Sequence, residues 1–220
     1  MKVSMIAALS LAGLAALAQA ADNAPTAGAR TWAFQAFLDG KPIGEHRFTV
    51  TADGNGGRKV ASEADFDVKF LGFNAYHYHH HADEQWAGEC LSGLQSTTDD
   101  DGKPASVRLV KTGDVNEIVT NAGRKSEPGC LMTYAYWNPA LREQKRLLNP
   151  QTGKVDAVTV ERAGSGSVPV GGKHVAATDW RITGGESPVD VWISAQGDWV
   201  GLDSMVGKGG GKHKLTYRLP

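Results

Sequence analysis

The stretch VASEADFDVKF, residues 60–70, decides the fold, because apolar and polar residues alternate along it without interruption. In an extended chain, one face would carry Val60, Ser62, Ala64, Phe66, Val68 and Phe70. The opposite face would carry Glu63, Asp65, Asp67 and Lys69. Since successive side chains point to opposite sides of a strand, the pattern predicts a strand with one buried and one solvated face. Such strands are typical of antiparallel sheets.

The same two-residue period extends to both sides of this stretch. Turn-forming clusters, such as DGKP at 39–42 and DGNGG at 53–57, separate the strand-like runs. The other runs are 32–38, 43–51, 75–86, 91–98, 106–112, 115–120, 130–136, 154–163, 173–183, 189–194, 199–206 and 212–219. One short helix is expected at 139–148, where Asn138 can cap it and Pro139 suits its first position. We therefore predict an all-β fold, an antiparallel barrel or curled sandwich of about a dozen short strands.

Composition excludes several classes of protein. The 220 residues include 27 glycines without a Gly-X-Y period, which rules out collagen. Hydrophobic residues make up 41% and charged residues 21%, a balance that argues against a disordered chain. The formal net charge of -1 gives no bulk attraction to nucleic acid or anionic membranes. Lysine and arginine form no basic aromatic stripe, so no nucleic-acid partner is expected.

The first twenty residues read as a secretory signal peptide. Lys2 supplies a positive start, residues 5–17 are apolar or small, and Ala18-Gln19-Ala20 forms a cleavage site. The apolar run is short for a bilayer span, so no transmembrane anchor is expected after cleavage. We therefore expect an exported protein, periplasmic or secreted. Residues 21–30 would form a flexible segment, and residues 31–220 a single β-rich domain.

The chain contains two cysteines, Cys90 and Cys130. In an oxidising compartment an even pair favours a disulfide, which in a chain-entropy account would add about 4 kcal/mol of stability. The alternative is a pair of thiols with a redox or metal-binding role, although no C-x-x-C spacing favours that role. The residues themselves leave both readings open.

Five blocks of sequence carry a resemblance to a known family. They are LDGKPIGEHRF at 38–48, ADFDV at 64–68, the Tyr-x-Tyr-x-His-x-x-x-Glu-x-Trp pattern at 76–86, CLMTYAYWNP at 130–139 and LLNPQTG at 147–153. Together they resemble an uncharacterised family of exported bacterial proteins, classified only as a domain of unknown function, over about residues 31–219. The resemblance implies a β-rich fold and a Cys90–Cys130 pair, and it implies no catalytic residues. The family tends to have alanine where this chain has Pro150, a difference confined to a turn.

The strand-like run 75–86 is rich in histidine, and alternation divides its side chains between two faces. If this run pairs with 60–70, matching of the apolar faces would set Phe70 opposite Tyr76, Val68 opposite Tyr78 and Phe66 opposite His80. The other face would then bring His77, His79 and His81 opposite Lys69, Asp67 and Asp65. Two imidazoles on one strand, completed by Asp65 or Asp67, could bind Zn or Cu. The alternative is a solvated ladder of histidines facing carboxylates.

The inward face of the same run predicts a second candidate site. Its residues are Tyr76, Tyr78, His80, Glu84 and Trp86, and Tyr136 and Trp137 would join them from the junction before the helix. These polar groups either satisfy one another in the core or line an internal cavity that binds an apolar or lipid-like small molecule.

A third hypothesis is an enzyme that uses the inward Tyr/His/Glu cluster. A general base at His80 oriented by Glu84 is disfavoured, because four residues along a strand separate them by about 13 Å. The sequence contains no Ser elbow and no H-E-x-x-H motif, so we assign no catalytic residue and expect no cofactor. Ligand binding in a cavity is therefore the leading hypothesis.

Overall fold

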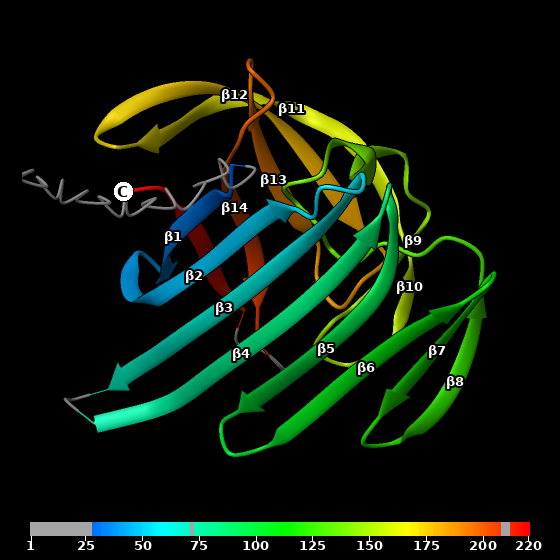
Figure 1. Cartoon of the computed structure of the whole chain (residues 1–220). Coiled ribbons are helices and arrows are strands. Elements are labelled where there is room, and N and C mark those ends of the chain that lie inside the picture. The colour runs from blue at the N-terminus through cyan, green and yellow to red at the C-terminus, as the bar shows by residue number, and fades with distance from the viewer. Residues whose placement is uncertain (1–27, 71–72, 208–211) are drawn as a thin grey trace, which may run out of the picture.

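The computed structural model describes residues 28–70, 73–207 and 212–220 (Figure 1). Within these ranges the first eight strands are β1 (Arg30–Leu38), β2 (Lys41–Ala52), β3 (Gly57–Phe70), β4 (Phe73–Ala87), β5 (Cys90–Asp100), β6 (Pro104–Thr112), β7 (Val115–Thr120) and β8 (Gly123–Pro128). The remaining elements are a 3-10 helix η1 (Pro139–Glu143) and strands β9 (Arg146–Leu148), β10 (Val155–Ala157), β11 (Thr159–Val170), β12 (Lys173–Thr183), β13 (Val189–Ser194), β14 (Trp199–Val206) and β15 (His213–Arg218). The predicted signal peptide, residues 1–20, lies outside the described residues.

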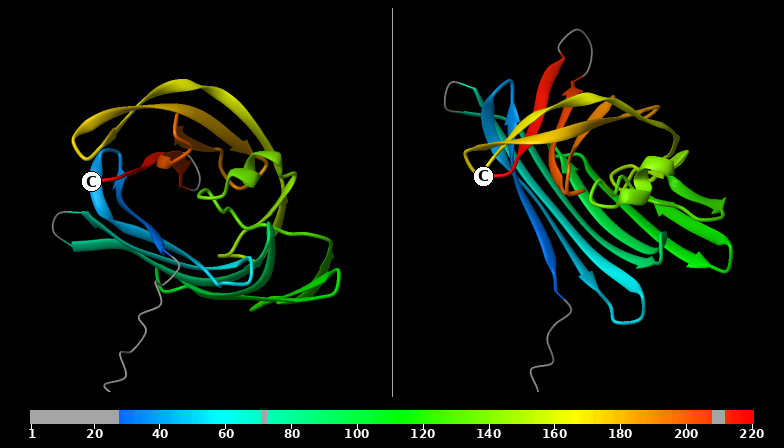
Figure 2. Two further views of the ribbon diagram at one scale, coloured as in Figure 1. Left: turned by 45° about the horizontal axis from the view of Figure 1, so that its top comes forward. Right: turned by 90° about the horizontal axis from the view of Figure 1, so that it is seen from above.

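Thirteen of these strands form one antiparallel sheet, in the order β11-β12-β13-β14-β15-β1-β2-β3-β4-β5-β6-β7-β8. Because β15 pairs with β1, the last strand joins the first and the sheet curls around an interior (Figure 2). In the described part of the chain, β8 and β11 each pair on one side only, so the curl stays open. The all-β prediction is confirmed, in the form of an open curled sheet.

The pairing of β3 with β4 corrects the predicted register. Phe66 lies opposite Tyr78, Ala64 opposite His80 and Asp67 opposite His77, two residues away from the expected pairs. Phe70 pairs with Phe73 instead of Tyr76, and the register shifts between Val68 and Lys69. A shift of two residues keeps every side chain on its face, which is why the predicted inward and outward faces are correct.

The predicted helix at 139–148 is shorter than expected. Only 139–143 is helical, and Asn138 caps it by accepting a hydrogen bond from the Ala140 backbone N–H at 3.0 Å. Residues 146–148 instead form strand β9, because Leu148 donates its N–H to Met132 and its side chain is fully buried. No helix in the described ranges is both long and apolar enough to cross a membrane.

Residues 129–158, which we call the plug, lie between the two halves of the curled sheet (Figure 2). On one side, the Leu91 N–H donates to Leu131 and the Ser96 hydroxyl donates to the Pro150 carbonyl. On the other side, Leu141 packs in the same cluster as residues of β11–β14. The fully buried residues of the plug are Leu131, Met132, Leu147 and Leu148. The plug therefore completes the hydrophobic core that the open sheet alone would leave exposed.

The two cysteines are joined in a disulfide, with their Cα atoms 5.1 Å apart. The bond links the start of β5 to the start of the plug. The disulfide prediction is confirmed, and the alternative of two free thiols is wrong for this structure.

Candidate functional site

A cavity of about 250 Å³ lies between the inner face of β2–β4, strands β14 and β15, and the plug. Of its 23 lining residues, thirteen are apolar or aromatic and ten are polar or charged. The lining from the sheet consists of His46, Phe48, Val60, Ser62, His80, Ala82, Glu84, Val189, Leu202, Ser204, Val206, Leu215 and Tyr217. The plug and one loop add Thr133, Tyr134, Ala135, Tyr136, Trp137, Asn149, Pro150, Gln151, Glu186 and Ser187.

Small residues at the centre of the β2–β4 wall explain the space. In register, Ser62 lies between Phe48 on β2 and Ala82 on β4. The next inward row places Ala64 between two histidines in the same way. These small side chains are buried but fill little volume, whereas close-packed cores leave few voids larger than a water molecule. The inward positions of β3, which the alternation predicts, therefore include the small side chains that leave this space.

His46 bridges two walls of the cavity. Its Nε2 lies 2.8 Å from the Ser62 hydroxyl on β3, and its Nδ1 lies 3.1 Å from the Tyr217 hydroxyl on β15. Burial, with a smaller contribution from the charge of His80, lowers the pKa of His46 to about 3. The imidazole is therefore neutral and acts as a hydrogen-bonding group. Sequence reasoning missed this residue, although the alternation of 43–51 places it on the same face as Phe48.

His80 is buried on the same wall, 3% exposed. Its Nδ1 lies 2.8 Å from the hydroxyl of Thr98 on β5. Burial, followed by the charges of His81 and His79, lowers the pKa of His80 to about 4. This imidazole is also neutral near pH 7, so the two histidines contribute polarity without charge.

Glu84 is the buried carboxyl group of the site, 6% exposed. The Trp86 indole N–H donates a hydrogen bond to Glu84 Oε2 at 2.8 Å. Burial raises the pKa of Glu84 to about 7, and hydrogen bonds from Trp86 and Thr133 offset part of that rise. None of the ion pairs among the described residues includes Glu84. The carboxyl is thus removed from water without a cationic partner.

The structure divides the seven predicted ligand-binding residues into two groups. Those that line the cavity are His80, Glu84, Tyr136 and Trp137. The other three contact their neighbours instead: the Tyr76 hydroxyl donates to Asp100 at 2.6 Å, Tyr78 stacks on Phe66, and Trp86 packs edge-on against Trp137. His80 and Glu84 have different hydrogen-bond partners, so the structure does not join them as a base and its orienting group.

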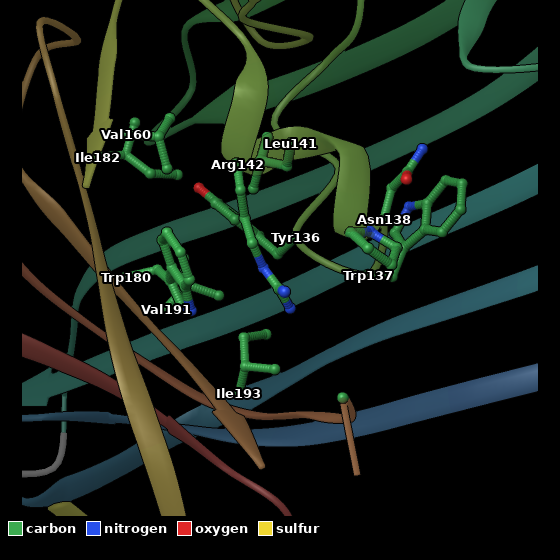
Figure 3. A pocket seen from close by; sticks show the side chains of 12 residues that line it. Tyr136, Trp137, Asn138, Leu141, Arg142, Val160, Trp180, Ile182, Val191 and Ile193 are labelled. Atoms are coloured by element: carbon green, nitrogen blue, oxygen red, sulfur yellow. The ribbon is translucent and has the colours of Figure 1, made fainter. Parts of the chain in front are cut away.

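A second, much smaller pocket lies beside Tyr136, between η1 and strands β11–β13 (Figure 3). The Arg142 guanidinium lies over the Trp180 ring, 5.0 Å from its centroid, and Ile193 lines the pocket beside them. The space is about 10 Å³, which is roughly the room that one water molecule needs. This pocket is a packing gap, so the cavity of about 250 Å³ stays the candidate site.

The outward histidines lie on the solvated face of β4. His77 pairs with Asp67 at 3.2 Å, His79 with Asp65 at 3.9 Å and His81 with Asp83 at 3.0 Å. One group could hold a metal ion, since single ligand atoms of Asp65, Asp67 and His77 all lie within 4.8 Å of one another. The three histidines therefore do not share one site, and the group that forms contains a single imidazole.

Comparison with known proteins agrees with the fold. Residues 34–218 match the family described as Domain of unknown function (DUF6134). A solved beta-barrel-like protein from Brucella abortus, of Domain of Unknown Function DUF1849, superposes with a TM-score of 0.57 at 11% sequence identity. That superposition covers 86% of this chain and 94% of the other, and it shows a shared fold alone. A search of curated proteins finds no match.

Proposed function

The chain belongs to the DUF6134 family, and from that membership and the cavity we propose that it is an exported β-protein that binds an apolar, lipid-like small molecule. The cavity carries this proposal. Small-molecule sites are mostly apolar concavities of about 300–1,000 Å³ with a few placed polar groups. The volume of about 250 Å³ lies just below that range and favours a compact or single-chain ligand over a phospholipid.

Export rests on two features. Residues 1–20 have the pattern of a cleavable secretory signal, and the Cys90–Cys130 disulfide is the kind of bond that persists in oxidising compartments. Mass spectrometry of the protein recovered from a periplasmic or secreted fraction should find a chain that begins at Ala21. A chain that retains residues 1–20 and stays in the cytoplasm would contradict export.

The binding proposal is tested with N-phenyl-1-naphthylamine, a neutral probe whose fluorescence rises in apolar surroundings. Titration should give saturable enhancement with the natural protein. Ala82→Leu places a larger side chain in the cavity and should abolish the enhancement, because Ala82 is 1% exposed and lines the space. Ala61→Leu is the matched control, since Ala61 is exposed on the outer face of β3. Equal enhancement by both variants would refute binding in this cavity.

A second candidate function is metal binding by Asp65, Asp67 and His77. The observation that favours it is the convergence of their ligand atoms. His and carboxylate ligands suit Zn²⁺. Calorimetric titration with zinc should show a site that His77→Ala removes and His81→Ala leaves intact, because His81 pairs with Asp83 outside the group. If both variants still bind zinc as the natural protein does, metal binding at this group is refuted.

A further inference from the structure

The charges around the cavity have one sign. Its two acidic lining residues are Glu84, buried in the wall, and Glu186, exposed in the loop before β13. Among the described residues that line the cavity, none is lysine or arginine. The two histidines that line the cavity are neutral near pH 7, since burial lowers the pKa of each. A ligand that enters this space therefore meets negative charge and no fixed positive charge.

Arg58, two positions along β3 from the residue opposite Glu84, does not neutralise this carboxyl group. Arg58 on β3 lies opposite Trp86 in register. Its guanidinium pairs with Glu89 at 3.2 Å, donates to the Gly88 carbonyl at 2.5 Å and lies 5.0 Å from the Trp137 ring centroid. Arg58 is therefore held at the end of the strand, where its charge has other partners.

The surroundings of Glu84 suit an ammonium group. A primary ammonium has three hydrogen-bond donors and no acceptor, so it can donate to a carboxylate and to the oxygens of Ser62 and Thr133, which also line the cavity. The rings of Tyr136 and Tyr217 line the same space, and aromatic faces attract cations most strongly where water is excluded. Folding has already removed Glu84 from water, so an incoming cation gains the ion pair without a further cost of burying the carboxyl.

We infer that the ligand is a primary amine with an apolar tail, whose ammonium group binds Glu84 while the tail lies along the apolar lining. This inference rests on the proposed function and adds the chemical class of the ligand to it. A fatty-acid carboxylate is excluded as the preferred ligand, because it would be buried near Glu84 without a cation. A neutral alcohol would fill the same space and lack the ion pair.

The test compares three ligands with the same tail: octylamine, 1-octanol and octanoate. Each displaces N-phenyl-1-naphthylamine from the natural protein at pH 8, where Glu84 is mostly ionised and an alkyl amine is still protonated. Octylamine should displace the probe at a concentration at least ten times lower than octanol, since hydrogen bonds to charged groups are worth roughly twice neutral ones. Octanoate should be the weakest of the three.

Glu84→Gln removes the charge and keeps the shape of the side chain. In this variant the ratio of octylamine to octanol affinity should fall to about one. Glu63→Gln is the matched control, because Glu63 lies on the exposed outer face of β3, and it should leave the ratio unchanged. The three-ligand comparison in the natural protein needs no variant, so it decides the question even if Glu84→Gln fails to fold.

The outcomes separate the two proposals. Equal displacement by octylamine and octanol, or stronger displacement by octanoate, would overturn the inference of an amine while leaving a cavity that binds apolar molecules. Failure of the probe to bind, or binding that Ala82→Leu does not affect, would overturn the proposed function itself. A tenfold preference that survives in Glu84→Gln would also overturn the inference, since the charge would then act elsewhere.

Discussion

Glu84→Gln should make the stability of the protein less sensitive to alkaline pH. Burial raises the pKa of Glu84 from its usual 4.5 to about 7 in the folded state. The folded protein therefore holds the proton more tightly than the unfolded chain does. This preference contributes stability that is fully present below pH 4.5 and is lost as the pH rises through 7. Glutamine does not titrate and still offers an oxygen to the Trp86 indole, so the variant lacks this loss.

The size of the effect follows from the two pKa values. Between pH 5 and pH 8 the natural protein should lose about 2.5 kcal/mol of unfolding free energy through Glu84 alone. The unfolding free energy of Glu84→Gln, relative to that of the natural protein, should rise by the same amount over that interval. Contributions from all other groups cancel in this difference, because both proteins share them.

Urea unfolding at pH 5 and pH 8, followed by tryptophan fluorescence, measures the four free energies. Glu63→Gln is the control, because it removes a carboxylate on the exposed face of β3. The difference in unfolding free energy between this variant and the natural protein should change little with pH. If the difference between Glu84→Gln and the natural protein is the same at both pH values, Glu84 is not held in a desolvated site. The charge argument for the ligand would then lose its basis.

Three further predictions concern other parts of the fold. Replacing Cys90 and Cys130 together with serine should lower the unfolding free energy by about 4 kcal/mol, measured by urea denaturation; an unchanged midpoint would contradict the prediction. Gly184→Ala should lower the melting temperature, because Gly184 has φ +98 and a Cβ there would collide with the Ala157 backbone; a melting temperature at or above the natural value would refute this contact. Since burial lowers the pKa of His46, its stability contribution is present above pH 6.5 and is lost as the pH falls toward 3. Between pH 8 and pH 5, His46→Gln should therefore lose about 2 kcal/mol less unfolding free energy than the natural protein. Parallel profiles of unfolding free energy against pH would contradict the neutral state of His46.

The faces of the strands could be predicted from the sequence, because a period of two needs only local information. Val60, Ala64 and Phe66 are buried on the inner face, as their alternation predicts. The register could not be predicted, since a slip of two residues and the shift after Val68 both leave the hydrophobic pattern unchanged. The end of the helix could not be predicted either, because residues 146–148 have adequate helix propensity but form tertiary bonds to Met132 and β10.

The candidate site could be predicted only where its residues share one strand. Alternation along 75–86 places His80 and Glu84 on the inner face, and both line the cavity. The contact between His46 and Tyr217 joins residues 171 positions apart, and it exists because the last strand pairs with the first. No local signal reports such a closure, so the second histidine and its partners were missed. Alternation with Phe48 is the signal in the sequence that places His46 on the inner face of its strand.

The inner wall keeps three ionisable groups in positions that oppose their charged forms, and stability alone does not explain them. Ser62 and Ala82 leave space that larger apolar side chains would fill, and filling a void of this kind usually stabilises a protein. Burial shifts the pKa of His46, His80 and Glu84 each toward the neutral form. Groups with shifted pKa values that gather in one cavity are typical of functional sites. Both ring nitrogens of His46 have partners in Ser62 and Tyr217, and Thr98 is the partner of His80 Nδ1. Because Glu84 is a buried carboxyl group without a cationic partner, it is the group that a ligand of opposite charge can pair with.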